Sequence, residues 1–353
     1  MTEHLDKRRV QDFARSLFGH YTSGVLTLMV DIGYKTGLFE ALARGAATSA
    51  ALAERAGLHE RYVREWLGAV TTGGLVDYDA ASGVFSLPPE HAACLTGTSS
   101  RNLAANSQVL AMLAGRLSKV AGCFRAGGGV PYSDFRPDFT EYQDVSWRLL
   151  YDGLLLKGFL PVAKGLPERL RAGIRVADIG CGTGHAVNLM AREFPASTFV
   201  GYDFSAEAIE RARAEARDMG LPNARFEVLD VTMLPAEPPF DLITSFDAVH
   251  DQRDPAMALR RIAGALAADG TYFMLEPRAA TGLEDNVGNP FAAYLYGMSV
   301  LHCMTVSLAE GGTGLGTAWG EQKAREMLRE AGFRSIDVAA APGPQNSIYI
   351  CRR

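Results

Sequence analysis

The sequence predicts an α/β protein: a doubly wound, mostly parallel sheet of seven strands, preceded by an N-terminal α-helical winged-helix domain. Two observations support this fold class. From residue 171 onward, short apolar segments alternate with amphipathic helical patterns, as in parallel sheets covered by helices on both faces. Before residue 98, helical segments, a turn and a hairpin pattern follow one another in the order of a winged helix. We therefore expect a winged-helix domain at 1–98, a helical linker and pocket region at 99–170, and an α/β domain at 171–353.

The first domain is predicted from its helix starts and stops. Helices are expected at 10–45, 48–56 and 60–72, and hairpin strands at 75–78 and 84–87. Thr48 and Ser49 are residue types that cap helix N-termini. Gly73 and Gly74 end the third helix, and Ser82-Gly83 suits the tight turn of a hairpin.

A winged helix raises the alternative of a DNA-binding regulator, because recognition helices use this shape. The charge argues against that alternative. Residues 1–98 contain nine Lys and Arg against eleven Asp and Glu. The helix at 60–72 interleaves Arg61 and Arg64 with Glu60 and Glu65, whereas a DNA reader shows a basic face. We expect no nucleic-acid partner. The competing hypothesis is a winged-helix regulator that binds DNA and senses a bound cofactor, which the second half of the chain would hold.

The α/β domain is predicted strand by strand. Strands are expected at 174–179, 198–203, 225–230, 241–246 and 271–276, with helices at 186–194, 206–219 and 255–267. A further helix at 321–331 stops at Gly332. The segments 335–339 and 347–351 then complete the sheet as an antiparallel final pair.

The most informative stretch is Val176–His185, where the first strand runs into a glycine turn and a helix. Gly180, Gly182 and Gly184 stand at alternate positions. Glycines at such a turn let a nucleotide-like ligand approach the backbone closely. A dinucleotide fingerprint begun at Gly180 needs glycine at position 185, where His185 stands.

The pattern D-x-G-x-G-x-G that begins at Asp178 resembles the first motif of class I S-adenosylmethionine-dependent methyltransferases, which have a Rossmann-like fold. Acids that end the second and third strands, Asp203 and Asp230, support the resemblance. It implies that Asp203 binds the ribose hydroxyls, Asp230 the adenine amino group and Asp178 the methionine part of S-adenosylmethionine. The remaining expected cofactor-site residues are Gly180, Gly182, Gly184, Phe204, Val231, Ser245 and Phe246.

The loops after the fourth and fifth strands should carry the chemistry, because ligands of open α/β sheets bind at the carboxyl ends of strands. Val249-His250-Asp251-Gln252 is similar to the His-Asp-Trp segment of winged-helix small-molecule O-methyltransferases, with Gln252 in place of the tryptophan. The resemblance implies that His250 is the general base and that Glu276, after the fifth strand, orients it. The expected catalytic residues are His250, Asp251, Glu276 and His302.

The resemblance also implies a homodimer joined through the winged-helix domain and a small-molecule acceptor, methylated most simply at a hydroxyl. The apolar first 45 residues independently favour a covered surface. The aromatics Tyr142, Trp147 and Tyr151 are expected to roof the substrate pocket, with plain core packing as the alternative. The tail at 301–322 departs from the plant-type enzymes and is similar to a bacterial subgroup.

A thiol or nitrogen acceptor is the alternative to the hydroxyl, and a zinc ion would favour the thiol. His250, Glu276 and Cys303 supply enough ligand types for zinc, which stabilises thiolates. Neighbours on a helix such as His302 and Cys303 point about 100° apart, so they rarely serve one ion together. We therefore favour pocket lining over a metal. Gly311–Gly316 lacks the G-K-[ST] ending of a phosphate loop and is interpreted as the hinge of a lid.

Composition sets the remaining expectations. The 353 residues are 48% hydrophobic and 21% charged, with a net charge of −5, which offers no general attraction to nucleic acid or anionic membranes. Five scattered cysteines favour a reduced, cytoplasmic protein without a disulfide framework. No apolar signal core follows the charged first residues. The uncharged stretch 286–309 is interpreted as a buried helix near the active site or a subunit interface, not a membrane span.

Overall fold

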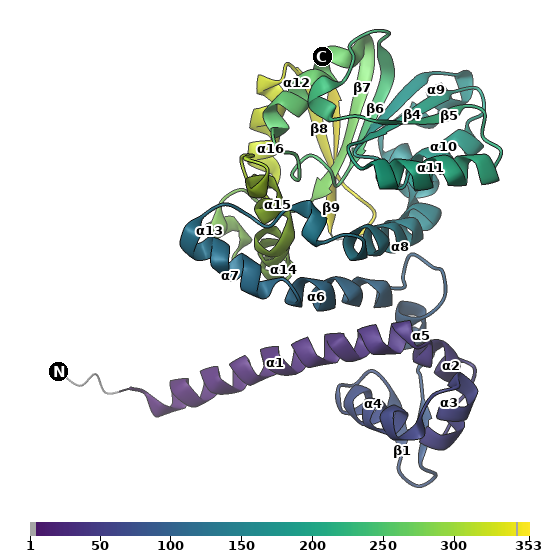
Figure 1. The fold of residues 1–353 in the computed structure, drawn as a ribbon, viewed down its shortest axis with the longest axis vertical. Coiled ribbons are helices and arrows are strands. Elements are labelled where there is room, and N and C mark those ends of the chain that lie inside the picture. Colours follow the sequence, from purple (N-terminus) through teal and green to yellow (C-terminus); the bar gives the residue numbers. More distant parts are fainter. Residues whose placement is uncertain (1–4, 344) are drawn as a thin grey trace. The chain divides into compact units, whose positions relative to one another are not determined.

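The structure is a computed structural model that describes residues 5–343 and 345–353. Residues 1–4, which belong to the charged start without an apolar signal core, lie outside the described residues. The chain forms two compact units, Met1–Ala114 and Gly115–Arg353. Figure 1 colours both along the sequence.

The first unit contains the winged helix. Its helices are α1 (Lys7–Lys35), α2 (Leu38–Ala43), α3 (Ser49–Ala56), α4 (Glu60–Thr72), α5 (Pro89–Leu95) and α6 (Ser107–Ala114). The antiparallel hairpin of β1 (Asp77–Asp79) and β2 (Val84–Ser86) is the wing. Thr48 caps α3 as expected, because its side chain accepts a hydrogen bond from the amide of Ala51. The helical segment predicted at 10–45 is divided into α1 and α2, because the chain turns at Gly37, which has a φ of 70°.

A small core holds this unit together. Phe39 and Trp66 pack edge to face with ring centroids 5.0 Å apart, and the indole of Trp66 donates to the carbonyl of Met29 at 2.8 Å. Leu52, Leu67 and their neighbours close the core around them. By contrast, α1 leaves many apolar side chains exposed, of which Phe13 (69%) and Phe18 (71%) are the largest.

The second unit is built on a seven-stranded sheet in the order β5-β4-β3-β6-β7-β9-β8. Its strands are β3 (Arg175–Ile179), β4 (Thr198–Asp203), β5 (Ala224–Val228), β6 (Phe240–Phe246), β7 (Leu266–Pro277), β8 (Ser335–Ala340) and β9 (Asn346–Arg352). The first five are parallel, and β9 runs antiparallel to both β7 and β8. The predicted doubly wound sheet with an antiparallel final pair is therefore confirmed.

Helices cover both faces of this sheet (Figure 1). One face packs against α9 (Leu166–Ala172), α10 (His185–Glu193) and α11 (Ala206–Asp218), with part of α8 (Asp138–Leu154). The other face packs against α12 (Pro255–Ala265) and α16 (Gly320–Glu330). The sheet thus lies between two apolar layers, and its carboxyl edge carries the glycine turn and the loops after β6 and β7.

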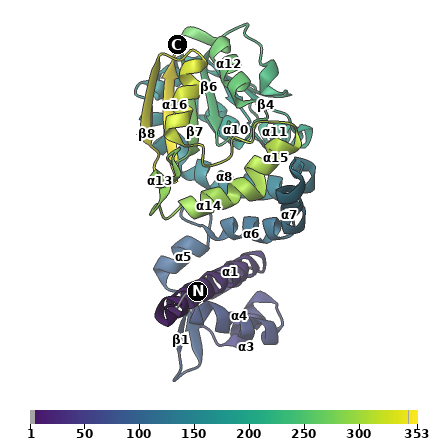
Figure 2. The same ribbon diagram turned by 90° about the vertical axis from the view of Figure 1, so that its left-hand side faces the viewer.

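The uncharged stretch 286–309 is mostly helical. It follows the short α13 (Leu283–Asn286) and contains α14 (Ala292–Met298), a π-helical segment (Ser299–Cys303) and α15 (Met304–Ala309). Figure 2 shows α14 and α15 as one continuous helical run. Among the described residues, Ala292–Ala309 is the one helix long and apolar enough to cross a membrane, with a mean hydropathy of 1.3. Within the protein 44% of it is buried.

Backbone contacts hold this helical run in place. A Cβ at Gly129, which follows α7 (Leu117–Ala126), would overlap the backbone of Thr305. A Cβ at Gly316, within the stretch predicted as a lid hinge, would overlap the hydroxyl of Ser299. The close approach of these two loops therefore depends on glycine. Movement of 311–316 remains a prediction.

Candidate active site

The glycine turn after β3 has a backbone that disfavours side chains. Gly180 and Gly184 have φ values of 69° and 77°, a region that glycine adopts at little cost. A Cβ at Gly180 would lie 2.7 Å from the Cβ of Ala248, and one at Gly184 would lie 2.5 Å from Ala212 and Phe226. Gly182 has open space around its Cα, so the turn is a cradle with one unobstructed side.

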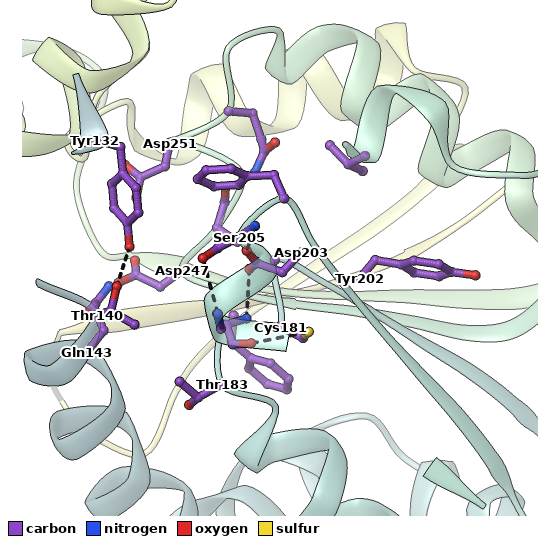
Figure 3. Close-up of a pocket in the computed structure, with 18 of the residues that line it drawn as sticks. Tyr132, Thr140, Gln143, Cys181, Thr183, Tyr202, Asp203, Ser205, Asp247 and Asp251 are labelled. Atoms are coloured by element: carbon purple, nitrogen blue, oxygen red, sulfur yellow. Dashed lines mark hydrogen bonds between the residues drawn. The ribbon is translucent and has the colours of Figure 1, made fainter. Parts of the chain in front are cut away.

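Asp203, at the end of β4, faces this cradle. Its carboxylate accepts hydrogen bonds from the amides of Gly182 at 2.9 Å and Ser205 at 2.8 Å (Figure 3). Burial raises the pKa of Asp203, while the two amides act in the opposite direction. Asp230 lies beyond the end of β5, where its carboxylate accepts from the amide of Thr232 at 2.8 Å.

A pocket of about 270 Å³ opens beside the turn. Nine of the predicted site residues line it: Gly180, Gly182, Asp203, Phe204, Asp230, Val231, Phe246, Asp251 and His302. The other six stand behind its wall: Asp178, Gly184, Ser245, His250, Glu276 and Cys303.

Two of these are buried within the sheet. Side chains alternate between the faces of a sheet, so Ser245 points away from its pocket-lining neighbour Phe246 and hydrogen-bonds the Tyr272 hydroxyl at 2.7 Å. Asp178 is 3% exposed and accepts from the Thr244 hydroxyl at 2.6 Å. Burial raises the pKa of Asp178 to about 7. Asp178 therefore lies on the strand that leads into the turn, whereas Ser245 joins β6 to β7.

His250 is positioned by Glu276, as the pairing of β6 with β7 predicts. Its Nδ1 lies 2.6 Å from Oε2 of Glu276, which is fully buried. The other oxygen of Glu276 accepts from the amide of Val249 at 2.9 Å, and the Trp319 indole donates to Oε2 at 3.2 Å. Glu276 is thus fixed by three groups, and it fixes the imidazole.

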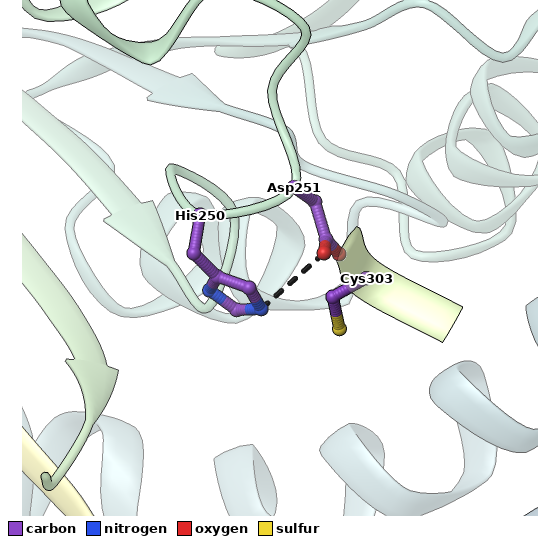
Figure 4. Close-up of side chains that lie close together, drawn as sticks. All are labelled: His250, Asp251 and Cys303. Atoms are coloured by element: carbon purple, nitrogen blue, oxygen red, sulfur yellow. Dashed lines mark ion pairs between the residues drawn. The ribbon is translucent and has the colours of Figure 1, made fainter. Parts of the chain in front are cut away.

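The far side of the same imidazole faces Asp251 and Cys303 (Figure 4). Its Nε2 lies 3.3 Å from Oδ1 of Asp251. Burial lowers the pKa of His250, but Asp251 and Glu276 together raise it well above its ordinary value. His250 is only 2% exposed, so Asp251 stands between it and the pocket.

The zinc ligands predicted from the sequence do not form one set. Glu276 contacts Nδ1 of His250, whereas Cys303 lies with Asp251 on the other side of the ring. Two alternative groups have ligand atoms within 4.8 Å of one another: His250 with Asp251 and Cys303, and His250 with Asp247 and Glu276. In the first group, Asp251 takes the place that the sequence assigned to Glu276.

Asp247 is a pocket residue that the sequence analysis missed. It follows β6 directly, lines the pocket and, among the described residues, is the non-glycine residue with a positive φ, 56°. Its Oδ1 is buried without a hydrogen bond and lies 3.8 Å from Nδ1 of His250. Burial raises the pKa of Asp247 to about 7. The available signal was its place, an acid at the carboxyl end of a buried strand.

His302 also lines the pocket and belongs to the π-helical segment. Its ring stacks on Phe139 with centroids 3.6 Å apart and meets Phe135 edge to face at 4.7 Å. Neither ring nitrogen has a hydrogen-bond partner among the described residues. Burial lowers the pKa of His302 to about 4, so the imidazole is neutral at neutral pH. π-helical turns inside helices often occur at functional sites.

A polar network on α8 was also missed. Asp144 accepts from the Thr183 hydroxyl at 2.5 Å and from Arg148 at 3.0 Å. His185 lies 2.9 Å from Asp152 and 2.8 Å from Glu215, so it connects α8 to α10 and α11.

The three aromatic residues expected to roof the substrate pocket differ in position. Trp147 and Tyr151 line the pocket and also pack on the core, whereas Tyr142 lies outside the lining.

Matches to known protein families identify the two domains of the chain. Residues 24–97 match the model of an Rv2258c-like winged helix-turn-helix domain, and residues 170–332 match that of a methyltransferase domain. The chain therefore carries a winged helix-turn-helix domain and a methyltransferase domain. The predicted resemblance is confirmed in both parts, and the pocket joins residues of the methyltransferase match to residues between 132 and 151 that precede it.

Curated methyltransferases match about a third of this chain. The chain is 33% identical to an uncharacterized methyltransferase, YcgJ, of Bacillus subtilis over 35% of this chain and 48% of that protein. It is 37% identical to the trans-aconitate 2-methyltransferase of Variovorax paradoxus, over 32% of this chain and 40% of the relative. The chain thus spans about half or less of the length of these relatives.

Solved structures match nearly the whole chain. A putative O-methyltransferase from Nostoc punctiforme has a TM-score of 0.76 at 18% identity, covering 96% of this chain and 98% of that one. Human N-acetylserotonin methyltransferase, in complex with S-adenosylmethionine, has a TM-score of 0.69 at 15% identity, covering 100% and 99%. These likenesses confirm the fold of the methyltransferase domain together with its winged helix.

Proposed function

We propose that the protein transfers the methyl group of S-adenosylmethionine to a small-molecule acceptor. One observation carries this proposal: a single pocket joins the glycine cradle and Asp203 to Asp247, Asp251 and His302. The first set suits a nucleoside, and the second suits an acceptor that loses a proton. Solved relatives bound to S-adenosylmethionine or its demethylated product support the choice of cofactor.

The residues present fit this cofactor. The open side of Gly182 leaves room for a ligand against the backbone. Asp203 and Asp230 are placed to hold ribose hydroxyls and an adenine amino group, and Phe204 and Val231 flank them in the lining. S-adenosylmethionine supplies an electrophilic methyl group on a sulfonium. Carboxylates around the pocket suit its positive charge.

For a hydroxyl acceptor, the proposed base is the pair of His250 and Asp251, of which Asp251 reaches the pocket and accepts the proton. Methyl transfer requires that the nucleophile be held in line and that its proton be removed. Asp251 reaches the pocket and lies 3.3 Å from Nε2 of His250, and Glu276 holds the other side of the ring. Glu276, His250 and Asp251 thus form a chain along which the acceptor's proton and its charge are shared.

A thiol acceptor is the second candidate, and the group of His250, Asp251 and Cys303 favours it. Tetrahedral zinc with ligand distances of about 2.0–2.3 Å has ligands roughly 3.3–3.8 Å apart. The 3.3 Å between Nε2 of His250 and Asp251 fits that spacing. Glu276 then holds the other nitrogen of the histidine, as carboxylates commonly do behind zinc ligands.

We further propose a cytoplasmic homodimer without a nucleic-acid or membrane partner. The five cysteines are all free thiols, which suits a reducing compartment. In α4, Arg61 pairs with Glu65 and Arg64 with Glu60, so this helix lacks the free basic face that DNA readers present.

Cofactor binding tests the proposal. The protein should bind S-adenosylmethionine or its demethylated product in the micromolar range or tighter by calorimetry. Asp203→Ala should weaken binding by about 1.5–3 kcal/mol, the scale of hydrogen bonds to a charged group. Asp218→Ala, at an exposed acid on α11, is the matched control and should bind normally. Equal binding by the Asp203 variant, or no binding by the wild type, would refute the proposed function.

A further inference from the structure

The glycine turn after β3 has little to hold its shape from within. Of residues 180–184, only Cys181 and Thr183 carry side chains, and the three glycines have φ values between 53° and 77°. Glycine loses more conformational freedom on folding than any other residue. Contacts from outside the turn must therefore fix it in one shape before a ligand arrives.

The two halves of the turn are fixed differently. In the first half, the amides of Gly180 and Cys181 donate to the carbonyl of Tyr202 in β4, at 2.8 Å and 3.0 Å. The second half depends on two carboxylates: Asp203 accepts from the amide of Gly182, as described above, and Asp144 of α8 accepts from the hydroxyl of Thr183 at 2.5 Å. Figure 3 shows Thr183 on the side of the turn nearest the helix that carries Thr140 and Gln143.

Asp144 belongs to a closed ring of polar contacts. Its Oδ1 accepts from Arg148 at 3.0 Å as well as from Thr183. The second terminal nitrogen of Arg148 contacts both Glu215 of α11 and Nδ1 of His185. His185 lies 2.8 Å from Glu215 and begins α10 directly after the turn. The contacts therefore run from Thr183 through α8 and α11 and return to the chain two residues later.

Charge strengthens this ring. Burial acts to raise the pKa of Glu215, but hydrogen bonds from His185, Arg148 and Asn188 lower it to about 2. Glu215 is therefore ionised at neutral pH and holds Arg148 beside Asp144. The side chains of Asp144, Arg148 and Glu215 are between 20% and 34% exposed. Partly buried, charge-assisted hydrogen bonds are about twice as strong as neutral ones, so the ring can hold a flexible turn.

We propose that Asp144 is a positioning residue for the cofactor, because it fixes the second half of the glycine turn through Thr183. The inference rests on the proposed methyltransferase function and adds a residue of α8, outside the sheet, to the cofactor site. Gln143 and Trp147 of the same helix line the pocket, so one set of contacts fixes both the turn and this part of the wall. A turn that is ordered only part of the time binds its ligand more weakly in proportion.

Calorimetry of the full-length protein with S-adenosylhomocysteine, the demethylated cofactor, tests the role. Thr183→Val removes the hydroxyl at nearly constant shape, and Asp144→Ala removes its acceptor. Each should raise Kd about tenfold, the result of a turn that is ordered about a tenth of the time. Thr183→Ser keeps a hydroxyl and should stay within about twofold of wild type. Asp138→Ala, at an exposed acid on the same helix, is the matched control and should bind normally.

The double variant separates positioning from direct contact. Asp144→Ala combined with Thr183→Val should again raise Kd about tenfold, because both changes remove one contact. A rise of about a hundredfold would show that the two residues act separately, and would overturn the proposal.

Circular dichroism at the assay temperature distinguishes positioning from a purely structural role. Folded variants that bind S-adenosylhomocysteine as tightly as wild type would also overturn the proposal. The comparison of Thr183→Val with Thr183→Ser decides the question alone if Asp144→Ala does not fold. Absence of binding by the wild type would refute the methyltransferase proposal instead.

Discussion

Residues at the carboxyl edge of the sheet divide into those that face the pocket and those that hold them in place. Asp203 faces the cradle, while Asp178 lies under the turn with 3% exposure. On the other side, Asp251 faces the pocket, and His250 and Glu276 stand behind it. Strand position predicts all five residues, but exposure decides which of them a ligand touches.

The role of His250 is the sharpest prediction at this scale. His250→Ala should lower turnover of a hydroxyl acceptor by about 10²–10⁴-fold and leave cofactor affinity almost unchanged. Raising the pH should partly restore activity on a phenol, because the phenol then ionises unaided. Steady-state kinetics and calorimetry on the same preparations would measure both effects.

The thiol alternative predicts different results for the same variants. Metal analysis would then find about one zinc ion per chain, because three protein ligands bind one ion. His250→Ala and Cys303→Ser would each deplete it, and chelators would abolish activity. If His250 is the base, Cys303→Ser should have little effect and chelators none. Stoichiometric zinc that both variants lose would favour a thiol acceptor over a hydroxyl acceptor.

The buried carboxyl of Asp178 predicts a pH-dependent stability. Burial raises its pKa to about 7, above the unfolded value, so the native state binds the extra proton. Stability should therefore fall as the pH rises between about 4 and 7. Asp178→Asn keeps an acceptor for Thr244 and removes the charge. Relative to wild type, this variant should gain on the order of 1–3 kcal/mol between pH 5 and pH 8.

Urea unfolding of both proteins at pH 5 and pH 8 would measure the difference. Comparing them removes the contributions of other titrating groups, such as His302, whose pKa burial lowers to about 4. A constant difference between the two proteins across this pH range would contradict the raised pKa of Asp178.

At the scale of elements, the sequence predicted the sheet better than the site. Apolar runs such as 241–246 predict strands because each buries both faces, and β6 begins within one residue of that range. The break after α1 was missed, since a single Gly37 is a weak signal inside an apolar helical pattern. The α8 network and the stack of His302 on Phe139 were also missed, because they join segments far apart in the sequence.

Glycine contacts predict how firmly the helix that carries His302 is held. Gly129→Ala places a methyl group against the backbone of Thr305 in α15, so the loop or the helix must shift. Overpacking of this kind costs about 1–3 kcal/mol. Gly122→Ala is the matched control, because Gly122 lies within α7 with open space around it. It should stabilise the protein by about 0.5–1 kcal/mol through a smaller loss of backbone entropy.

Denaturant midpoints would rank these two variants against wild type. The Gly129 variant should also lose activity on any acceptor, because His302 and Cys303 belong to the same helical run as Thr305. Equal stability of the Gly129 and Gly122 variants would show that α15 is not held by this contact.

At the scale of the whole molecule, the main feature is the exposed apolar surface of α1. Its 29 residues leave Phe13, Phe18 and Tyr21 between 59% and 71% exposed, and further apolar residues continue along the helix. An apolar surface of this extent is uncommon on monomeric proteins and marks a site of association. A second copy of the chain fits best, because a twofold contact can pair this apolar surface with itself.

The dimer is tested by mass in solution. Light scattering at micromolar concentration should give twice the mass of the 38.0 kDa chain. Replacing Phe13 and Phe18 together by Glu should yield a monomer, because two charges would otherwise be buried at the contact. Tyr62→Glu, at an 80% exposed ring on α4, is the matched control and should remain dimeric. A wild-type protein that is monomeric at this concentration would contradict the dimer, and a Phe13 and Phe18 variant that stays dimeric would move the contact away from α1.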